Sequence, residues 1–271
     1  MNRPGKRLRR MLIGIGLGLA MGYGGVFGAL YISQSSMIYP APGIGATVPS
    51  GYHTIKYTTA DGLDLAALFR PPAMGKRVLV FFHGNGDSWD GAAAANRLPA
   101  EAGYGVLLVE YRGYGSNPGK PSEAGLYADG RAALAWLKAE QGIGADQVVL
   151  VGNSLGSGPA AQLASETGTA GLVIISGFTS LPDVVGDKLP WVPARLLTRD
   201  SYDNLAKLPS IRAPVLLLHG LDDTMIGPDH ARALGKANPQ ARLALIPGFG
   251  HELAYYDASQ IALLGWLNGL R

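Results

Sequence analysis

The chain of 271 residues contains no cysteine. This absence excludes a disulfide framework, a thiol nucleophile and every metal site built on thiolates. Charged residues are also scarce, at 16% of the sequence, whereas hydrophobic residues make up 47%. Soluble domains usually contain about 25% charged residues. The composition therefore predicts a large buried core, and its fraction of charged residues is low for a wholly soluble protein.

The basic character of the chain is confined to its amino-terminal tip. The net charge is +3, but the first ten residues, MNRPGKRLRR, hold five of the 23 basic residues and no acidic residue. Removing these five leaves 18 basic against 20 acidic residues, a net charge of −2. The rest of the chain has no basic stripe, and we expect no nucleic-acid partner.

The segment 11–32, MLIGIGLGLAMGYGGVFGALYI, contains no charged residue. As a helix its 22 residues reach about 33 Å, enough to cross a bilayer core. We expect residues 1–33 to form a cytoplasmic tip and a transmembrane signal-anchor. The upstream cations keep the tip in the cytoplasm, so the rest of the chain would lie on the non-cytoplasmic side, in the periplasm of a bacterium. A cleaved secretion signal ending near Ala20-Met21-Gly22 is the alternative.

Strand and helix patterns alternate after a linker at 34–50. Continuous Val/Ile/Leu runs predict strands covered on both faces, and their alternation with helices predicts a parallel sheet. The expected strands are 52–59, 63–69, 77–82, 105–111, 147–152, 171–176, 214–220 and 241–248. The first two flank the turn Ala60-Asp-Gly62 and should form an antiparallel edge. We therefore expect one α/β domain over 51–271, with a mostly parallel eight-stranded sheet flanked by helices and no large lid.

A serine between two glycines follows one of these strands, in VVLVGNSLGSG (148–158). The segment Gly152-Asn-Ser-Leu-Gly156 fits the G-x-S-x-G pattern of a nucleophile elbow. A serine at the carboxyl end of a strand must turn sharply into the next helix, and glycine avoids a Cβ clash in such a turn. Ser154 is therefore the candidate nucleophile.

A serine nucleophile needs a base, and the base needs an acid to orient it. His251 follows the last strand, in GFGHEL, at the same edge of a parallel sheet as Ser154. The segment HGLDDTMIG (219–227) offers Asp222 and Asp223 just past another strand. The chain order Ser, Asp, His matches the order of the α/β-hydrolase triad.

Negative charge develops on the carbonyl oxygen of a substrate during attack, and two backbone N–H groups are expected to stabilise it. One is the N–H of Leu155, directly after the nucleophile. The other is expected in the loop HGNG (83–86), at Asn85. Leu155 and Asn85 thus form the predicted oxyanion hole.

Four stretches together resemble the α/β-hydrolase superfamily, and more narrowly the group of Bem46 and the ABHD13- and ABHD17-like serine hydrolases. They are FFHGNG (81–86), EYRGYGSNPGKPSEAGLYADGRAAL (110–134), VGNSLGSGPA (151–160) and HGLDDTMIG…GHE (219–252). The segment QSSMIYP (34–40) resembles the part that follows the membrane anchor in such proteins. The resemblance assigns the acid to Asp223 and implies a structural role for Glu110. Gly227 departs from the proline of the pattern.

These observations predict a membrane-anchored serine hydrolase that cleaves an acyl ester or thioester through Ser154, His251 and Asp223. The alternatives are a serine peptidase or amidase of the same fold and a catalytically inactive, membrane-tethered binding module. We expect no cofactor and no metal. The expected partners are a small-molecule or lipid-like acyl substrate and a membrane, contacted through residues 11–32. Five apolar residues of the irregular segment 177–210 either pack on the sheet or line an acyl pocket: Leu189, Trp191, Val192, Leu196 and Leu197.

Overall fold

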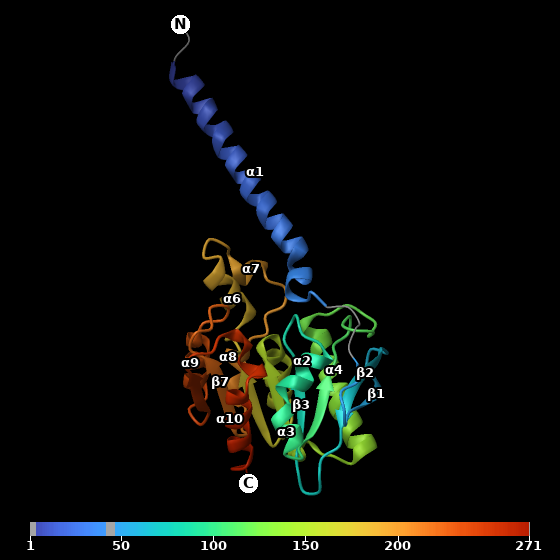
Figure 1. Cartoon of the computed structure of the whole chain (residues 1–271). Coiled ribbons are helices and arrows are strands. Elements are labelled where there is room, and N and C mark those ends of the chain that lie inside the picture. Colours follow the sequence, from blue (N-terminus) through green and yellow to red (C-terminus); the bar gives the residue numbers. More distant parts are fainter. Residues whose placement is uncertain (1–3, 42–46, 271) are drawn as a thin grey trace.

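The computed structural model describes residues 4–41 and 47–270. Helix α1 (Pro4–Ile38) extends from one side of a body in which helices flank a central sheet (Figure 1). Residues 1–3 of the expected tip, 42–46 of the expected linker and the final residue, 271, lie outside the described part of the chain.

Eight strands form one sheet in the order β1-β2-β4-β3-β5-β6-β7-β8. The pairs β1·β2 and β2·β4 are antiparallel, and all other neighbours are parallel. This arrangement confirms the predicted mostly parallel sheet with an antiparallel edge. The strands are β1 (His53–Thr58), β2 (Asp64–Arg70), β3 (Val78–Phe82), β4 (Gly105–Val109), β5 (Val148–Asn153), β6 (Gly171–Ile175), β7 (Val215–Gly220) and β8 (Arg242–Ile246).

Helices cover both faces of the sheet because its central strands are apolar on both faces. In β3, Val80 and Phe82 join a core on one side, whereas Leu79 and Phe81 join a core on the other, as the two-residue period of a strand requires. The first core is closed by α4 (Glu123–Gln141), α5 (Ser157–Glu166) and α9 (Pro228–Ala237). The second core is closed by α2 (Trp89–Ala95), α3 (Arg97–Glu101) and α10 (Asp257–Leu267).

The alanine-rich segment 89–102 forms two short helices, α2 and α3. Pro99 has no N–H to donate, and its ring would collide with the carbonyl of Ala95 in a continuous helix. The break falls at Asn96, whose φ is −116° and whose side-chain amide donates to the Ala92 carbonyl at 2.8 Å.

The connection between β6 and β7 contains only short helices: α6 (Leu181–Lys188), α7 (Ala194–Leu197) and α8 (Asn204–Lys207). Two of them have side-chain caps, since Ser180 accepts from the Asp183 amide and Asp203 accepts from the Ala206 amide. Helices α6 and α7 lie beside the body end of α1 (Figure 1).

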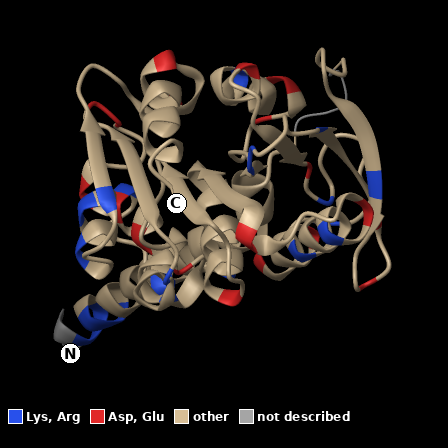
Figure 2. Cartoon of the chain, turned by 90° about the horizontal axis from the view of Figure 1, so that it is seen from below, with Lys and Arg blue, Asp and Glu red and all other residues tan. Residues whose placement is uncertain are grey.

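Helix α1 is the one helix among the described residues that is long and apolar enough to cross a membrane. Its most apolar window is not buried in the protein at all. Lys and Arg gather at its outer end, whereas both signs of charge are scattered over the body (Figure 2). The helix continues to Ile38, and Tyr39, directly after it, is buried and bonds Asp200 at 2.6 Å. The first residues of the expected linker are therefore helical and docked.

A buried ion pair fixes the connection between β4 and α4. The Arg112 guanidinium donates to Asp129 at 2.8 Å through Nε and to Asp61 at 2.7 Å, and the Arg112 amide donates to Asp129 at 2.9 Å. The Asp129 side chain is fully buried. Burial raises the pKa of Asp129, and the hydrogen bonds from Arg112 only partly offset this effect.

Replacing Asp129 by Asn should destabilise the fold strongly, because it removes one charge of a buried pair and leaves Arg112 partly uncompensated. We expect a loss of about 3 kcal/mol in the free energy of unfolding. Urea unfolding of the full chain in detergent, followed by circular dichroism, measures this loss.

Glu166→Gln is the matched control, because Glu166 forms a bidentate pair with Arg131 that is largely exposed. Exposed pairs contribute less than about 1 kcal/mol. Equal losses in D129N and E166Q would contradict a structural role for the buried pair.

Candidate active site

The backbone turns sharply at Ser154, between β5 and α5. Ser154 has a φ of +52°, in the left-handed region that non-glycine residues rarely adopt, and it begins a single turn of 3₁₀ helix (Ser154–Gly156). A Cβ on Gly156 would overlap the Phe82 carbonyl of the neighbouring strand, and a Cβ on Gly152 would lie 2.6 Å from the Ser157 Cα. The two glycines therefore allow the tight turn, and the strain at Ser154 is held by its surroundings.

The structure brings His251 to Ser154 across 97 positions of sequence. His251 follows β8 and starts a short 3₁₀ helix (His251–Tyr255). Its Nε2 lies 2.9 Å from the Ser154 Oγ, within hydrogen-bonding distance. Ser154 is 9% exposed and lines a cavity, and the His251 side chain is 21% exposed.

Asp223 lies behind the imidazole, with its Oδ2 at 2.8 Å from the His251 Nδ1. Its Oδ1 accepts the backbone amides of Met225 at 2.9 Å and Ile226 at 2.8 Å, and the His219 Nε2 lies 3.3 Å from Oδ2. Burial opposes the charged carboxylate, but the hydrogen bonds from His219, His251 and Ile226 outweigh it and hold the pKa of Asp223 well below its usual range.

The neighbouring Asp222 has an exposed side chain, and its backbone amide bonds Phe249. The structure therefore distinguishes the two aspartates that the residue pattern left open. A charged Asp223 accepts a hydrogen bond from the N–H at Nδ1, which leaves the lone pair of Nε2 directed at the Ser154 hydroxyl. This arrangement can remove a proton from the serine.

Asn85 and Leu155, the predicted oxyanion residues, line one cavity together with Ser154. The Asn85 peptide is oriented by Tyr114, whose hydroxyl donates to the Asn85 carbonyl at 2.9 Å. The Tyr111 hydroxyl similarly donates to the His83 carbonyl at 2.7 Å. Both tyrosines belong to the YRGYG stretch, which therefore holds the loop 83–86 beside the serine turn.

Below this loop, Glu110 and His83 form a buried pair. The His83 Nε2 lies 3.1 Å from Glu110, and its Nδ1 lies 2.7 Å from the Gly84 carbonyl. Burial opposes a charged imidazole, but the hydrogen bond and the charge of Glu110 raise the pKa of His83 above its usual value. Glu110 thus bonds the base of the loop 83–86.

The cavity at Ser154 has a volume of about 240 Å³. Its walls come from the serine turn, from α6 and the segment after it, and from the last turns of α1. Its lining residues are mostly apolar: Leu30, Tyr31, Gln34, Met37, Ile38, Asn85, Ser154, Leu155, Phe178, Leu181, Val184, Val185, Leu189, Val192, Leu197, Thr198, Met225 and Ile226.

Three of the five apolar residues suggested for an acyl pocket, Leu189, Val192 and Leu197, line this cavity. The other two do not. Trp191 packs its ring near Phe27 of α1, with centroids 6.1 Å apart, and Leu196 is 84% exposed. The sequence did not indicate that α1 forms part of the wall, because its apolar residues look alike whether they face lipid or a cavity.

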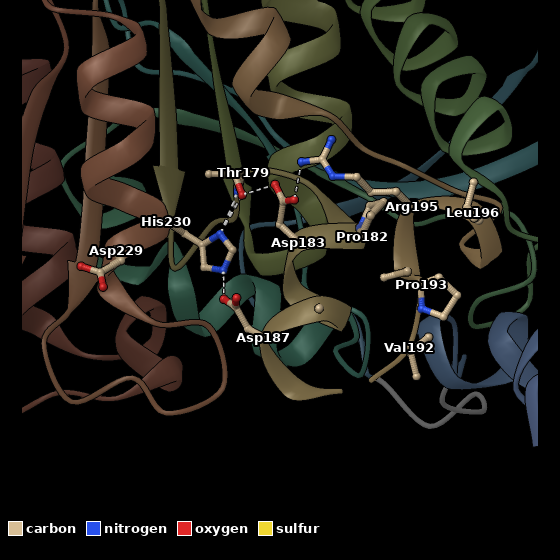
Figure 3. Close-up of a pocket in the computed structure, with 12 residues that line it drawn as sticks. Thr179, Pro182, Asp183, Asp187, Val192, Pro193, Arg195, Leu196, Asp229 and His230 are labelled. Carbon is tan, nitrogen blue, oxygen red and sulfur yellow. Dashed lines mark hydrogen bonds and ion pairs between the residues drawn. The ribbon is translucent and has the colours of Figure 1, made fainter. Parts of the chain in front are cut away.

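A second, larger pocket of about 550 Å³ lies on the opposite side of α6 and does not include Ser154. His230 lies there between Thr179, at 2.9 Å, and Asp187, at 3.0 Å (Figure 3). Asp183 pairs with Arg195 in the same pocket. Residues 4–41 and 47–270 contain no group of three or more His, Asp or Glu side chains arranged to hold a metal ion.

Comparison with known proteins supports the fold assignment. Residues 77–198 match the family model for the alpha/beta hydrolase fold. The chain is 35% identical over 235 residues to the uncharacterized protein Rv2307c of Mycobacterium tuberculosis, covering 84% of this chain and 83% of that protein. It is 32% identical over 183 residues to alpha/beta hydrolase domain-containing protein 17B of Xenopus tropicalis, covering 65% of this chain and 60% of that protein.

Solved structures with low sequence identity share the same architecture. The Pyrococcus furiosus esterase Pf2001 aligns with a TM-score of 0.65 at 19% identity, covering 85% of this chain and 96% of the esterase. A membrane phospholipase A aligns with a TM-score of 0.61 at 18% identity, covering 97% of this chain and 99% of the phospholipase. With this sheet, the matched segment and these structures, the chain has the alpha/beta hydrolase fold and belongs to one family with the mycobacterial protein Rv2307c.

Proposed function

We propose that this protein is a membrane-anchored serine hydrolase that cleaves an acyl ester or thioester through an acyl-enzyme on Ser154. The observation that carries the proposal is the hydrogen-bonded series Ser154 Oγ, His251 and Asp223, with links of 2.9 Å and 2.8 Å. A nucleophile, a base and an orienting acid in bonding contact are the arrangement that activates a serine.

In the proposed reaction, the His251 Nε2 takes the proton of Ser154 as the Oγ attacks the acyl carbonyl. The charge of Asp223 keeps the imidazole in the required tautomer and stabilises the imidazolium that forms. His251 then gives its proton to the leaving alcohol or thiol. A water molecule, deprotonated by the same imidazole, attacks the acyl-enzyme and releases the acid.

The backbone amides of Asn85 and Leu155 are the proposed donors to the carbonyl oxygen as it becomes negative. One such donor contributes about 3 kcal/mol to transition-state stabilisation. The bond from Tyr114 to the Asn85 carbonyl supports this role, since it restricts rotation of the neighbouring peptides. The ten-residue helix α5 begins next to Ser154, and its positive end favours the same negative charge.

Helix α1 supports a membrane location, because it is long, apolar and exposed, with cations at its outer end. We propose that it is an uncleaved anchor and that the body lies on the non-cytoplasmic side, as the positive-inside rule predicts. The esterases and the membrane phospholipase A among the similar structures support an ester as the substrate.

Labelling by a fluorophosphonate probe tests the nucleophile. The wild-type protein should react covalently, and Ser154→Ala should not, because the probe needs an activated serine oxygen. Labelling is read by gel fluorescence on purified full-length protein. Ser157→Ala is a control, since Ser157 lies one turn away and bonds Asn204; persistent labelling of S154A would remove Ser154 from the proposed role.

Asp223→Asn should lower kcat on a p-nitrophenyl ester by about 10³–10⁴-fold, because an amide no longer selects the tautomer in which Nε2 is free. Asp222→Asn, one residue away and exposed, should leave kcat within about twofold. Steady-state kinetics of the two variants measure the difference. Equal activities of D223N and D222N would contradict the assignment of the acid.

The lowered pKa of Asp223 also predicts a pH dependence of stability. A carboxyl whose pKa is lower in the folded state stabilises the fold above its unfolded value, about 3.9, and loses this contribution as the pH falls toward the folded value. Scanning calorimetry measures the stability of wild type relative to D223N. This relative stability should not fall between pH 7 and pH 5, and it should fall when the pH is lowered further, below about pH 4. A relative stability that already falls between pH 7 and pH 5 would contradict the lowered pKa.

A further inference from the structure

One wall of the Ser154 cavity is formed by α1, the same helix that is proposed to anchor the protein. Leu30, Tyr31, Gln34, Met37 and Ile38 all line the cavity. Their spacing of three, four and seven residues places them on one face of the helix. Ile32, on a different face, is 77% exposed. The helix therefore contributes a defined stripe to the site and leaves its other faces free.

Polar contacts fix this end of α1 against the segment around α7. Gln34 is held at both ends of its amide, because its Nε2 donates to the Leu197 carbonyl at 3.2 Å and its Oε1 accepts the Arg199 amide at 2.8 Å. The Arg199 guanidinium lies 4.1 Å from the centre of the Tyr31 ring. Farther out, the Tyr23 hydroxyl donates to the Trp191 carbonyl at 3.0 Å. The wall is thus a docked element of the structure.

The part of α1 that contacts the body begins at Tyr23, before the helix is long enough to have crossed the bilayer core. A bilayer core of about 30 Å needs about 20 helical residues. Residues 11–22, between the cationic tip and the first contact at Tyr23, extend only about 18 Å. The remaining membrane-spanning residues must lie beside the body. Trp191, which is 49% exposed and packs near Phe27 of α1, would then lie at the bilayer surface.

The cavity itself suits an acyl chain. No charged side chain of the described residues lines it, and its few polar lining groups include Ser154 and Gln34, which are already hydrogen-bonded. Its volume of about 240 Å³ lies below the range of about 300–1,000 Å³ that drug-sized ligands occupy. Such a space holds a short acyl chain or part of a longer one, whereas a headgroup with two chains does not fit.

We propose that the substrate is a lipid ester whose acyl chain lies in the bilayer that holds α1, and that α1, at Leu30, sets the chain length that fits. This inference rests on the proposed function. The Ser154 Oγ forms a bond to the acyl carbon, the ester C–O bond breaks, and His251 gives its proton to the lipid alcohol. Water then releases the fatty acid. The chain passes from the bilayer along α1 into the cavity without crossing water.

The test compares full-length wild type, Leu30→Trp, Leu30→Ala and Ile32→Trp in phosphatidylcholine vesicles. The readout is the ratio of kcat/KM for p-nitrophenyl palmitate to kcat/KM for p-nitrophenyl octanoate, both dissolved in those vesicles. Each buried methylene contributes about fourfold to binding. Filling the space of two methylenes in L30W should lower the ratio about fifteenfold. Leu30→Ala should raise it, and I32W should leave it within about twofold.

Equal ratios in wild type, L30W and L30A would overturn the role of α1, and a fall in I32W as large as in L30W would do the same. A second arm supplies the palmitate ester in separate vesicles. We expect hydrolysis to be much slower there, and equal rates would overturn the bilayer as the source. If wild type hydrolyses the octanoate ester and S154A does not, the proposed function stands even where the chain-length and vesicle results contradict this inference. If wild type does not hydrolyse the octanoate ester, both proposals are overturned.

Discussion

The whole site depends on one backbone turn, in which Ser154 takes a left-handed conformation at the carboxyl end of β5. Such a conformation costs about 1–3 kcal/mol and persists only where the surroundings enforce it. Here Gly156 lies against the backbone of β3 and Gly152 against the following helix, with no room for a side chain at either position. The paired strands therefore hold the serine, and the direction of its hydroxyl follows from the sheet.

The parallel strands place the other groups at the same edge. Asp223 follows β7 and His251 follows β8, so the register of these two strands sets the distance between carboxylate and imidazole. The Glu110–His83 pair and the tyrosines after β4 fix the loop that follows β3. Helix α1 closes the cavity over this edge. In the account proposed here, one helix thus anchors the enzyme and shapes the space next to its nucleophile.

The sequence predicted the sheet well, because a continuous apolar run is a local signal of a buried strand. A serine between glycines is likewise a local signal of a sharp turn after a strand. The sequence-based prediction failed where tertiary contacts decide. Trp191 and Leu196 were candidates for the acyl pocket, yet one packs near α1 and the other faces outward. Composition distinguishes apolar from polar residues, but it does not show which apolar surfaces meet.

The same limit applies to the site. Ser154, His251 and both aspartates were identifiable from position after strands, but only the resemblance, and then the geometry, separated Asp223 from Asp222. The contacts of His219 with Asp223 and of Gln34 with the α7 segment had no sequence signal, because each joins residues through the fold. A hydrogen bond between distant segments cannot be read from the spacing of either one.

The most direct test of the central claim is to trap the covalent intermediate. The full-length protein is mixed with a p-nitrophenyl ester, quenched in acid within the first turnover, digested, and analysed by mass spectrometry. We expect the acyl group on the peptide containing Ser154, at the serine oxygen. Acylation of a different residue, or turnover without any acylated peptide, would contradict the proposed role of Ser154.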